Sequence, residues 1–186
     1  MSMKKTHALA LSGLFTALAV VCLILADTLL IKSSAFCFIL AAFMCGYPAE
    51  LSTMLYGICS TIAAFLLGII ISPYKLHCLT FLGLAVFVLI CQYLIKRSRT
   101  EKAPGKATTA IIIAAAWNVF IITAVVLYSL LIGNIMDLTA GTVMENLPVS
   151  LLAVIAVIVL EALGPIIYIA YGQFINFMNR YVKNRR

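Results

Sequence analysis

Long, nearly uncharged apolar stretches constrain this chain more than any other feature of its sequence. Each of the clearest stretches has the roughly 20 predominantly apolar residues that a helix needs to cross the hydrocarbon core of a bilayer. They occupy residues 8–26, 51–71, 76–95, 107–132 and 147–171. The pattern predicts an all-α integral membrane protein.

The composition excludes most alternatives to a membrane protein. Apolar residues make up 65% of the 186-residue chain and charged residues 10%, whereas a soluble domain is about half apolar and a quarter charged. So few charges could not cover a soluble surface. We therefore exclude a secreted disulfide scaffold, a nucleic-acid-binding domain and a soluble enzyme, and we expect a multi-pass protein of the cell (plasma) membrane.

A shorter apolar run at residues 35–49 decides how many times the chain is predicted to cross the membrane. If this run is a short span, there are six transmembrane helices, and eleven of the 13 Lys and Arg residues lie in the cytoplasm. Only Lys32 and Lys75 are then outside, which fits the positive-inside rule. With five spans the basic segment 96–106 would move outside. We therefore expect one six-helix domain over residues 1–186, with both termini and the loop 96–106 in the cytoplasm.

The end of the second run carries two further features. Gly46-Tyr47-Pro48 is a turn-like punctuation of the apolar pattern. Glu50 follows it, either beyond the short helix or in its last turn. We interpret Glu50 as a solvated residue at the inner membrane interface.

Catalytic and metal-binding motifs are missing from the sequence. It has no H-E-x-x-H, no G-x-S-x-G and no pair of carboxylates spaced within one helix. His7 and His77 fall on opposite membrane faces, and none of the six cysteines is part of a C-x-x-C motif. We expect no enzyme activity, no metal and no cofactor, and we interpret the cysteines as small buried hydrophobic residues.

Two polar residues are predicted to lie deep in the bilayer. Asn118 is midway along its span, and Glu161 is near the middle of the last one. An acid at the bilayer centre costs roughly 2.5–3.5 kcal/mol on insertion scales, so such residues usually face the bundle interior and mark a binding site or pathway. We therefore expect both in a ligand site.

Four further residues complete the predicted ligand site: Trp117, Tyr128, Tyr168 and Lys75. The first two would form an aromatic wall, Tyr168 shares a face with Glu161, and Lys75 would reach over an external pocket. The alternatives remain open. Glu161 would make only a structural hydrogen bond to Asn118 or Tyr168, and Trp117 would pack against lipid or in the core.

Small residues form stripes on two predicted helices. The first helix carries Ser12, Gly13, Thr16 and Ala17, two adjacent pairs spaced four residues apart that let another helix approach closely. We expect either internal packing or a docking face for a separate membrane subunit. The third helix carries Thr53, Gly57, Ser60, Thr61, Ala64 and Gly68 at helical spacing. There, close internal packing is the favoured interpretation.

The chain as a whole resembles the substrate-binding, or S, components of energy-coupling factor (ECF) transporters in length and predicted topology. Gly13 and Ala17, within the stretch 8–19, stand where these proteins most often have two alanines. A subgroup of S-component-like proteins shares four further features: Glu50, Tyr56, the turn Pro73-x-Lys75 and Asn118. The chain departs from the family late in helix four, where Gln92-Tyr93 is the nearest remnant of a Tyr-Tyr-Pro-type motif.

The resemblance implies a fold, a function and partners. It implies a six-helix S-component bundle that captures a vitamin-like micronutrient from outside, in a pocket lined mainly by helices four to six. The helix-one face, with Gly13 and Ala17, would dock on a transmembrane coupling (T) subunit that works with two cytoplasmic ATPase subunits. The ligand itself is not indicated, and no nucleic acid is implied.

Two other functions remain as alternatives. A non-transport assembly or scaffold subunit, such as a rod-shape-determining membrane protein, would use the same stripes to hold its partners. A standalone carrier or channel is less well matched, because carriers often show paired broken helices or inverted repeats. This chain has at most one such break, at Pro165.

Overall fold

The computed structural model describes residues 5–28, 31–72, 75–99, 105–132 and 149–183. These residues form six helices: α1 (Lys5–Thr28), α2 (Ile31–Leu51), α3 (Met54–Ile71), α4 (Lys75–Ser98), α5 (Lys106–Ile132) and α7 (Val149–Lys183). Each helix contains or closely matches one of the apolar stretches, so the all-helical prediction is confirmed.

Four of the described helices are long and apolar enough to cross a membrane. Their spanning segments are Thr6–Ala26, Met54–Ile71, His77–Ser98 and Lys106–Leu127. In α2 the apolar segment is shorter, Ala35–Leu51, as the sequence predicted. The chain is thus a multi-pass membrane protein.

The helix α2 runs through the expected punctuation at Gly46-Tyr47-Pro48 and ends only at Leu51. Proline removes one backbone hydrogen-bond donor, yet Tyr47 and Pro48 are fully buried, and this packing holds the helix together. Gly46 lets the Tyr171 side chain come close to the α2 backbone, since a Cβ at this position would lie 2.5 Å from the Tyr171 hydroxyl. The glycine is therefore explained by contact with a tyrosine of α7, and no turn forms at this position.

The linker between α4 and α5 is shorter than the predicted loop 96–106. Helix α4 continues through Lys96 and Arg97 to Ser98, and α5 begins at Lys106. The basic residues therefore extend a helix beyond its apolar segment. Similarly, α7 is 35 residues long and continues past the predicted end at residue 171.

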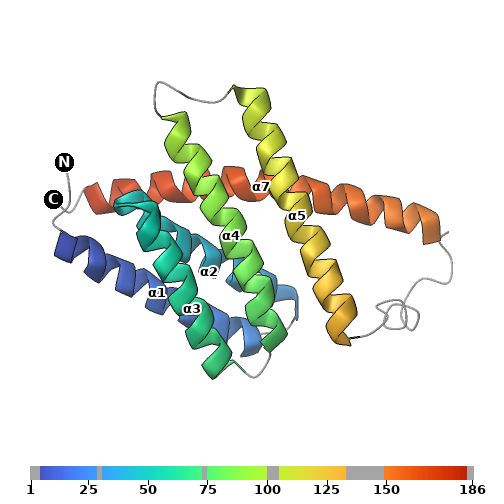
Figure 1. Cartoon of the computed structure of the whole chain (residues 1–186), viewed down its shortest axis with the longest axis horizontal. Coiled ribbons are helices and arrows are strands. Elements are labelled where there is room, and N and C mark those ends of the chain that lie inside the picture. Colours follow the sequence, from blue (N-terminus) through green and yellow to red (C-terminus); the bar gives the residue numbers. More distant parts are fainter. Residues whose placement is uncertain (1–4, 29–30, 73–74, 100–104, 133–148, 184–186) are drawn as a thin grey trace.

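Helix α2 lies at the centre of the arrangement. It packs against α1, α3, α4 and α7, whereas the main contacts of α5 in the described structure are with α4 and α7. In Figure 1, α3, α4 and α5 run steeply across the view and α7 crosses α4 and α5. The largest fully buried side chains, Tyr47, Tyr171, Phe81 and Phe87, come from α2, α4 and α7.

The small-residue stripe of α3 packs inside the protein. Its buried residues are Gly57, Ser60, Thr61, Ala64 and Gly68, which are the predicted stripe without Thr53. A Cβ at Gly57 would lie 2.8 Å from Ala49 Cβ and from Leu89 Cδ2. The expected close internal packing is confirmed.

Candidate functional site

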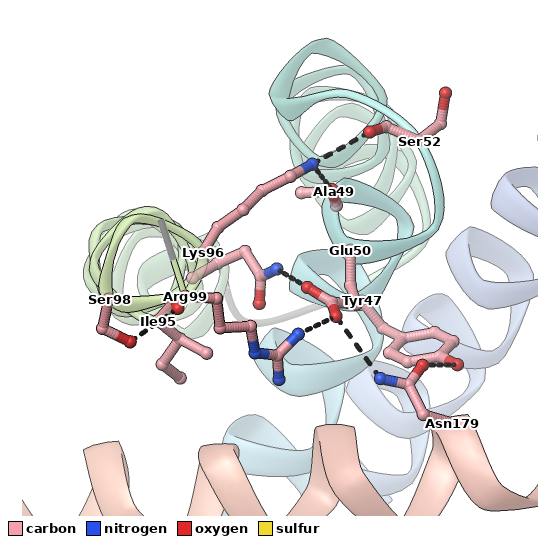
Figure 2. A network of polar contacts seen from close by, with 10 residues as sticks. Tyr47, Ala49, Glu50, Ser52, Ile95, Lys96, Ser98, Arg99 and Asn179 are labelled. Carbon is pink, nitrogen blue, oxygen red and sulfur yellow. Dashed lines mark hydrogen bonds and ion pairs between the residues drawn. The ribbon is translucent and has the colours of Figure 1, made fainter. Parts of the chain in front are cut away.

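Polar side chains gather around Glu50 where α2 and α4 end (Figure 2). Glu50 Oε2 accepts a hydrogen bond from Gln92 Nε2 at 2.7 Å, and Oε1 accepts one from Asn179 Nδ2 at 3.3 Å. Oε1 also forms an ion pair with Arg99, and only 11% of the Glu50 side chain is exposed. The interpretation of Glu50 as a solvated residue is wrong, because its carboxylate joins α2, α4 and α7.

Two neighbours extend this cluster. The Tyr47 hydroxyl donates to Asn179 Oδ1 at 3.1 Å. Lys96 Nζ donates to the carbonyl oxygens of Ala49 at 3.1 Å and Ser52 at 2.9 Å, as Figure 2 shows. A cation at these carbonyls satisfies groups that the end of a helix leaves unpaired. The cluster thus fixes the end of α2 against α4 and α7.

The deep polar pair lies between α5 and α7. Asn118 Nδ2 donates to Glu161 Oε2 at 3.3 Å and to the Ala114 carbonyl oxygen at 3.0 Å. Both side chains are half-buried. The structural hydrogen bond between Asn118 and Glu161 is therefore present, and their role in ligand binding stays a prediction.

Trp117 packs in the core, which is one of the alternatives to ligand binding that the sequence left open. It is 4% exposed, and its ring centroid lies 4.9 Å from that of Phe87 and 5.1 Å from that of Phe120. Gly164 lies against it, since a Cβ there would be 2.6 Å from Trp117 Cγ. The close contact joins α5 to α7.

The structure brings together only part of the predicted ligand site. Tyr168 is half-buried and packs against the core, on the same helix as Glu161. The side chains of Lys75 and Tyr128 lie outside the described residues, so their positions stay predictions. Of the predicted residues, Asn118, Trp117 and Glu161 thus lie at the contact of α5 and α7.

The predicted docking stripe on α1 divides into two faces. Ser12 is 7% exposed, and Thr16 forms a 2.7 Å hydrogen bond with the Ser60 hydroxyl of α3. Gly13 and Ala17 are exposed, and a Cβ at Gly13 would meet nothing within 4 Å. Internal packing explains Ser12 and Thr16, but it does not explain Gly13 and Ala17.

Three surface hollows lie elsewhere in the described structure. The first, of about 390 Å³, is lined by apolar side chains of α3 and α4 together with Thr61 and Tyr93. A second, of about 510 Å³, is lined by Arg99, Asn176, Asn179 and Arg180, and a third, of about 30 Å³, lies between α4 and α5. None of these three is lined by Trp117, Asn118 or Glu161.

Among the described residues, no group of three His, Cys, Asp or Glu side chains is arranged to hold a metal ion. None of the six cysteines forms a disulfide bond in the described structure, and four of them are buried, which fits their interpretation as small hydrophobic residues. The chain finds no match among protein-family models, curated proteins or solved structures.

The sequence did not reveal the Glu50 cluster, although one signal was available. Glu50, Gln92 and Asn179 each fall near the predicted inner end of an even-numbered span. Helices that cross in alternating directions bring such ends to one side of a bundle. Three polar residues at matched depth could therefore have suggested a common site.

Proposed function

We propose that this chain is the membrane-embedded substrate-capture subunit of an ECF-type importer. In this function it binds a small, vitamin-like micronutrient from outside and docks on a transmembrane coupling subunit. ATP hydrolysis belongs to two separate cytoplasmic ATPase subunits. Both termini lie in the cytoplasm, and all six helices cross the plasma membrane.

The exposed face of α1 carries this proposal. Glycine in a helix interior costs roughly 0.5–1 kcal/mol relative to alanine, and Gly13 has no neighbour in the described structure that requires its small size. Ala17 is the next small residue on the same exposed face, and Leu9 and Leu14 beside it are also exposed. A flat strip between larger apolar side chains fits a helix of another membrane subunit.

The ligand site of the proposal lies between α5 and α7. Polar groups at membrane depth usually serve a binding site or a pathway, and Asn118 and Glu161 remain half-buried rather than fully enclosed. Each side chain keeps hydrogen-bonding capacity beyond the 3.3 Å bond that joins them. They could therefore exchange that bond for bonds to a ligand.

The docking face is tested by adding bulk to it. Gly13→Leu and Ala17→Leu should each abolish recovery of the coupling subunit and ATPases with the purified chain, because a leucine separates the two helices. Native mass spectrometry of the complex from mild detergent measures this. Ala110→Leu is the matched control, since Ala110 is exposed on α5, whose main contacts in the described structure are with α4 and α7.

The same experiment distinguishes the transport proposal from the scaffold alternative. Recovery of a coupling subunit with two ATPases, lost in Gly13→Leu and retained in Ala110→Leu, supports the importer. Recovery of cell-wall synthesis proteins instead would favour the assembly subunit. Normal complexes from both α1 variants would refute docking through this face.

A further inference from the structure

A basic hollow adjoins the Glu50 cluster but is separate from the proposed ligand site. Its volume is about 510 Å³, and it is lined by Arg99 of the α4 end and by Asn176, Asn179 and Arg180 of α7. The last three residues stand at i, i+3 and i+4, so they share one face of the helix. Four hydrogen-bond donors therefore surround one space.

Two of the lining residues are held in place by the Glu50 cluster. Arg99 forms an ion pair with Glu50, and its side chain remains 47% exposed. Asn179 donates to Glu50 Oε1 and accepts from the Tyr47 hydroxyl, as Figure 2 shows. Because these bonds fix their side chains, the wall of the hollow is organised before any ligand arrives.

The other two lining residues have no structural task in the described part of the chain. Arg180 and Asn176 make no hydrogen bond or ion pair with any described residue, and both are exposed. Glu50 balances one of the two guanidinium charges, so a positive charge remains at the hollow. An unbalanced arginine beside amide donors matches a phosphate group, which accepts several hydrogen bonds from a guanidinium.

We propose that the hollow lined by Arg99, Asn176, Asn179 and Arg180 binds a phosphate group. The ligand is the headgroup of an anionic phospholipid or a free phosphate, and the same donors recognise both. The hollow lies where the apolar part of α4 has ended in Lys96 and Arg97, which is the depth of lipid headgroups beside a membrane helix. Basic pockets between helices at this depth favour anionic lipids.

The test is a titration of the delipidated protein in mild detergent, followed by native mass spectrometry. Phosphatidylglycerol, phosphatidylcholine and inorganic phosphate are the probes. Phosphatidylglycerol should bind more tightly than phosphatidylcholine, and Arg180→Gln should weaken its binding about fivefold, the effect of one basic residue near a lipid surface. Arg180 has no structural partner among the described residues, so this variant should fold.

Arg97→Gln is the matched control, because it removes the same charge from an exposed arginine that contacts Tyr93 and does not line the hollow. Arg180-dependent binding of phosphatidylglycerol supports a lipid ligand, and Arg180-dependent binding of inorganic phosphate alone supports a soluble one. The proposal is overturned if neither phosphatidylglycerol nor inorganic phosphate binds. It is also overturned if both lipids bind equally, or if Arg97→Gln weakens binding as much as Arg180→Gln.

Discussion

At the scale of single residues, Gly13 and Gly164 occupy opposite environments. A Cβ added to Gly13 would meet no atom within 4 Å, whereas one added to Gly164 would lie 2.6 Å from Trp117 Cγ. Among the described residues, packing requires only the second glycine to be small. The same substitution should therefore have opposite effects at the two positions.

Gly164→Ala should lower the free energy of unfolding by about 1–3 kcal/mol, the usual cost of forcing extra bulk into a packed site. Gly13→Ala should raise it by up to about 1 kcal/mol, because alanine is the better helix former. Thermal unfolding in detergent, followed by the fluorescence of Trp117, measures both. Trp117 is the single tryptophan of the chain, so the signal reports the contact between α5 and α7 directly. A Gly164→Ala protein as stable as the wild type would contradict the packing argument.

The Glu50 cluster shows why sequence reasoning reaches some residues and not others. Deep polar residues such as Asn118 and Glu161 stand out against an apolar background, and the structure joins them by a hydrogen bond. Glu50 sits at a helix end, where an acid is ordinary, so nothing local distinguished it from a solvated residue. Its partners Gln92 and Asn179 are 42 and 129 positions away, and only the packing of α2, α4 and α7 brings them together.

At the scale of helices, α1 has two faces with different environments: Ser12 is buried, whereas Gly13 and Ala17 are exposed. Thr16 donates its hydroxyl to the Ser12 carbonyl oxygen at 2.8 Å, which leaves the Ser60 hydroxyl as the donor in the 2.7 Å bond between α1 and α3. Ser60 is 2% exposed and depends on this contact. We expect residues of the inner face to control stability, and, under the proposed function, residues of the outer face to control association.

Thr16→Val should lower the free energy of unfolding by about 1 kcal/mol, in the range measured for hydrogen bonds between membrane helices. Ser60→Ala should cost a similar amount, and the double variant should cost less than the two losses added together, because one shared bond is removed. Thermal unfolding of the three variants gives this cycle. None of them should reduce recovery of the coupling subunit, in contrast to Ala17→Leu. Strict additivity would show that the two hydroxyls act independently.

Helix positions followed from the sequence because apolar length is a local property, but helix ends did not. The predicted ends at residues 95 and 171 mark where apolar residues stop, whereas α4 and α7 continue to Ser98 and Lys183. Polar residues can extend a helix once its backbone hydrogen bonds are established. Pro48 likewise fails to end α2, because it and Tyr47 are fully buried and the Tyr47 ring packs against Phe15 of α1 and Phe174 of α7.

At the scale of the whole molecule, the ends of three helices meet at one polar cluster. The C-terminal ends of α2 and α4 meet the last third of α7 at Glu50. Alternating crossings would bring these three ends to one membrane face, together with the basic residues Lys96, Arg97 and Arg180. The packing brings these ends together, and the charge pattern alone predicts which membrane face they occupy.

The charge pattern predicts that this face is cytoplasmic, which reporter fusions can measure. Green fluorescent protein, which fluoresces in the cytoplasm, and alkaline phosphatase, which is active outside it, would each be fused after residues 102, 140 and 186. We expect fluorescence after 102 and 186 and phosphatase activity after 140, because positively charged segments stay inside. The two reporters give opposite signals at every site, so each fusion is its own control.

The reverse pattern would contradict the positive-inside argument and would place the Glu50 cluster and the basic hollow on the outer face. The proposed phosphate site would then face the outer leaflet. The α1 face would present Gly13 and Ala17 to a coupling subunit in the inverted orientation.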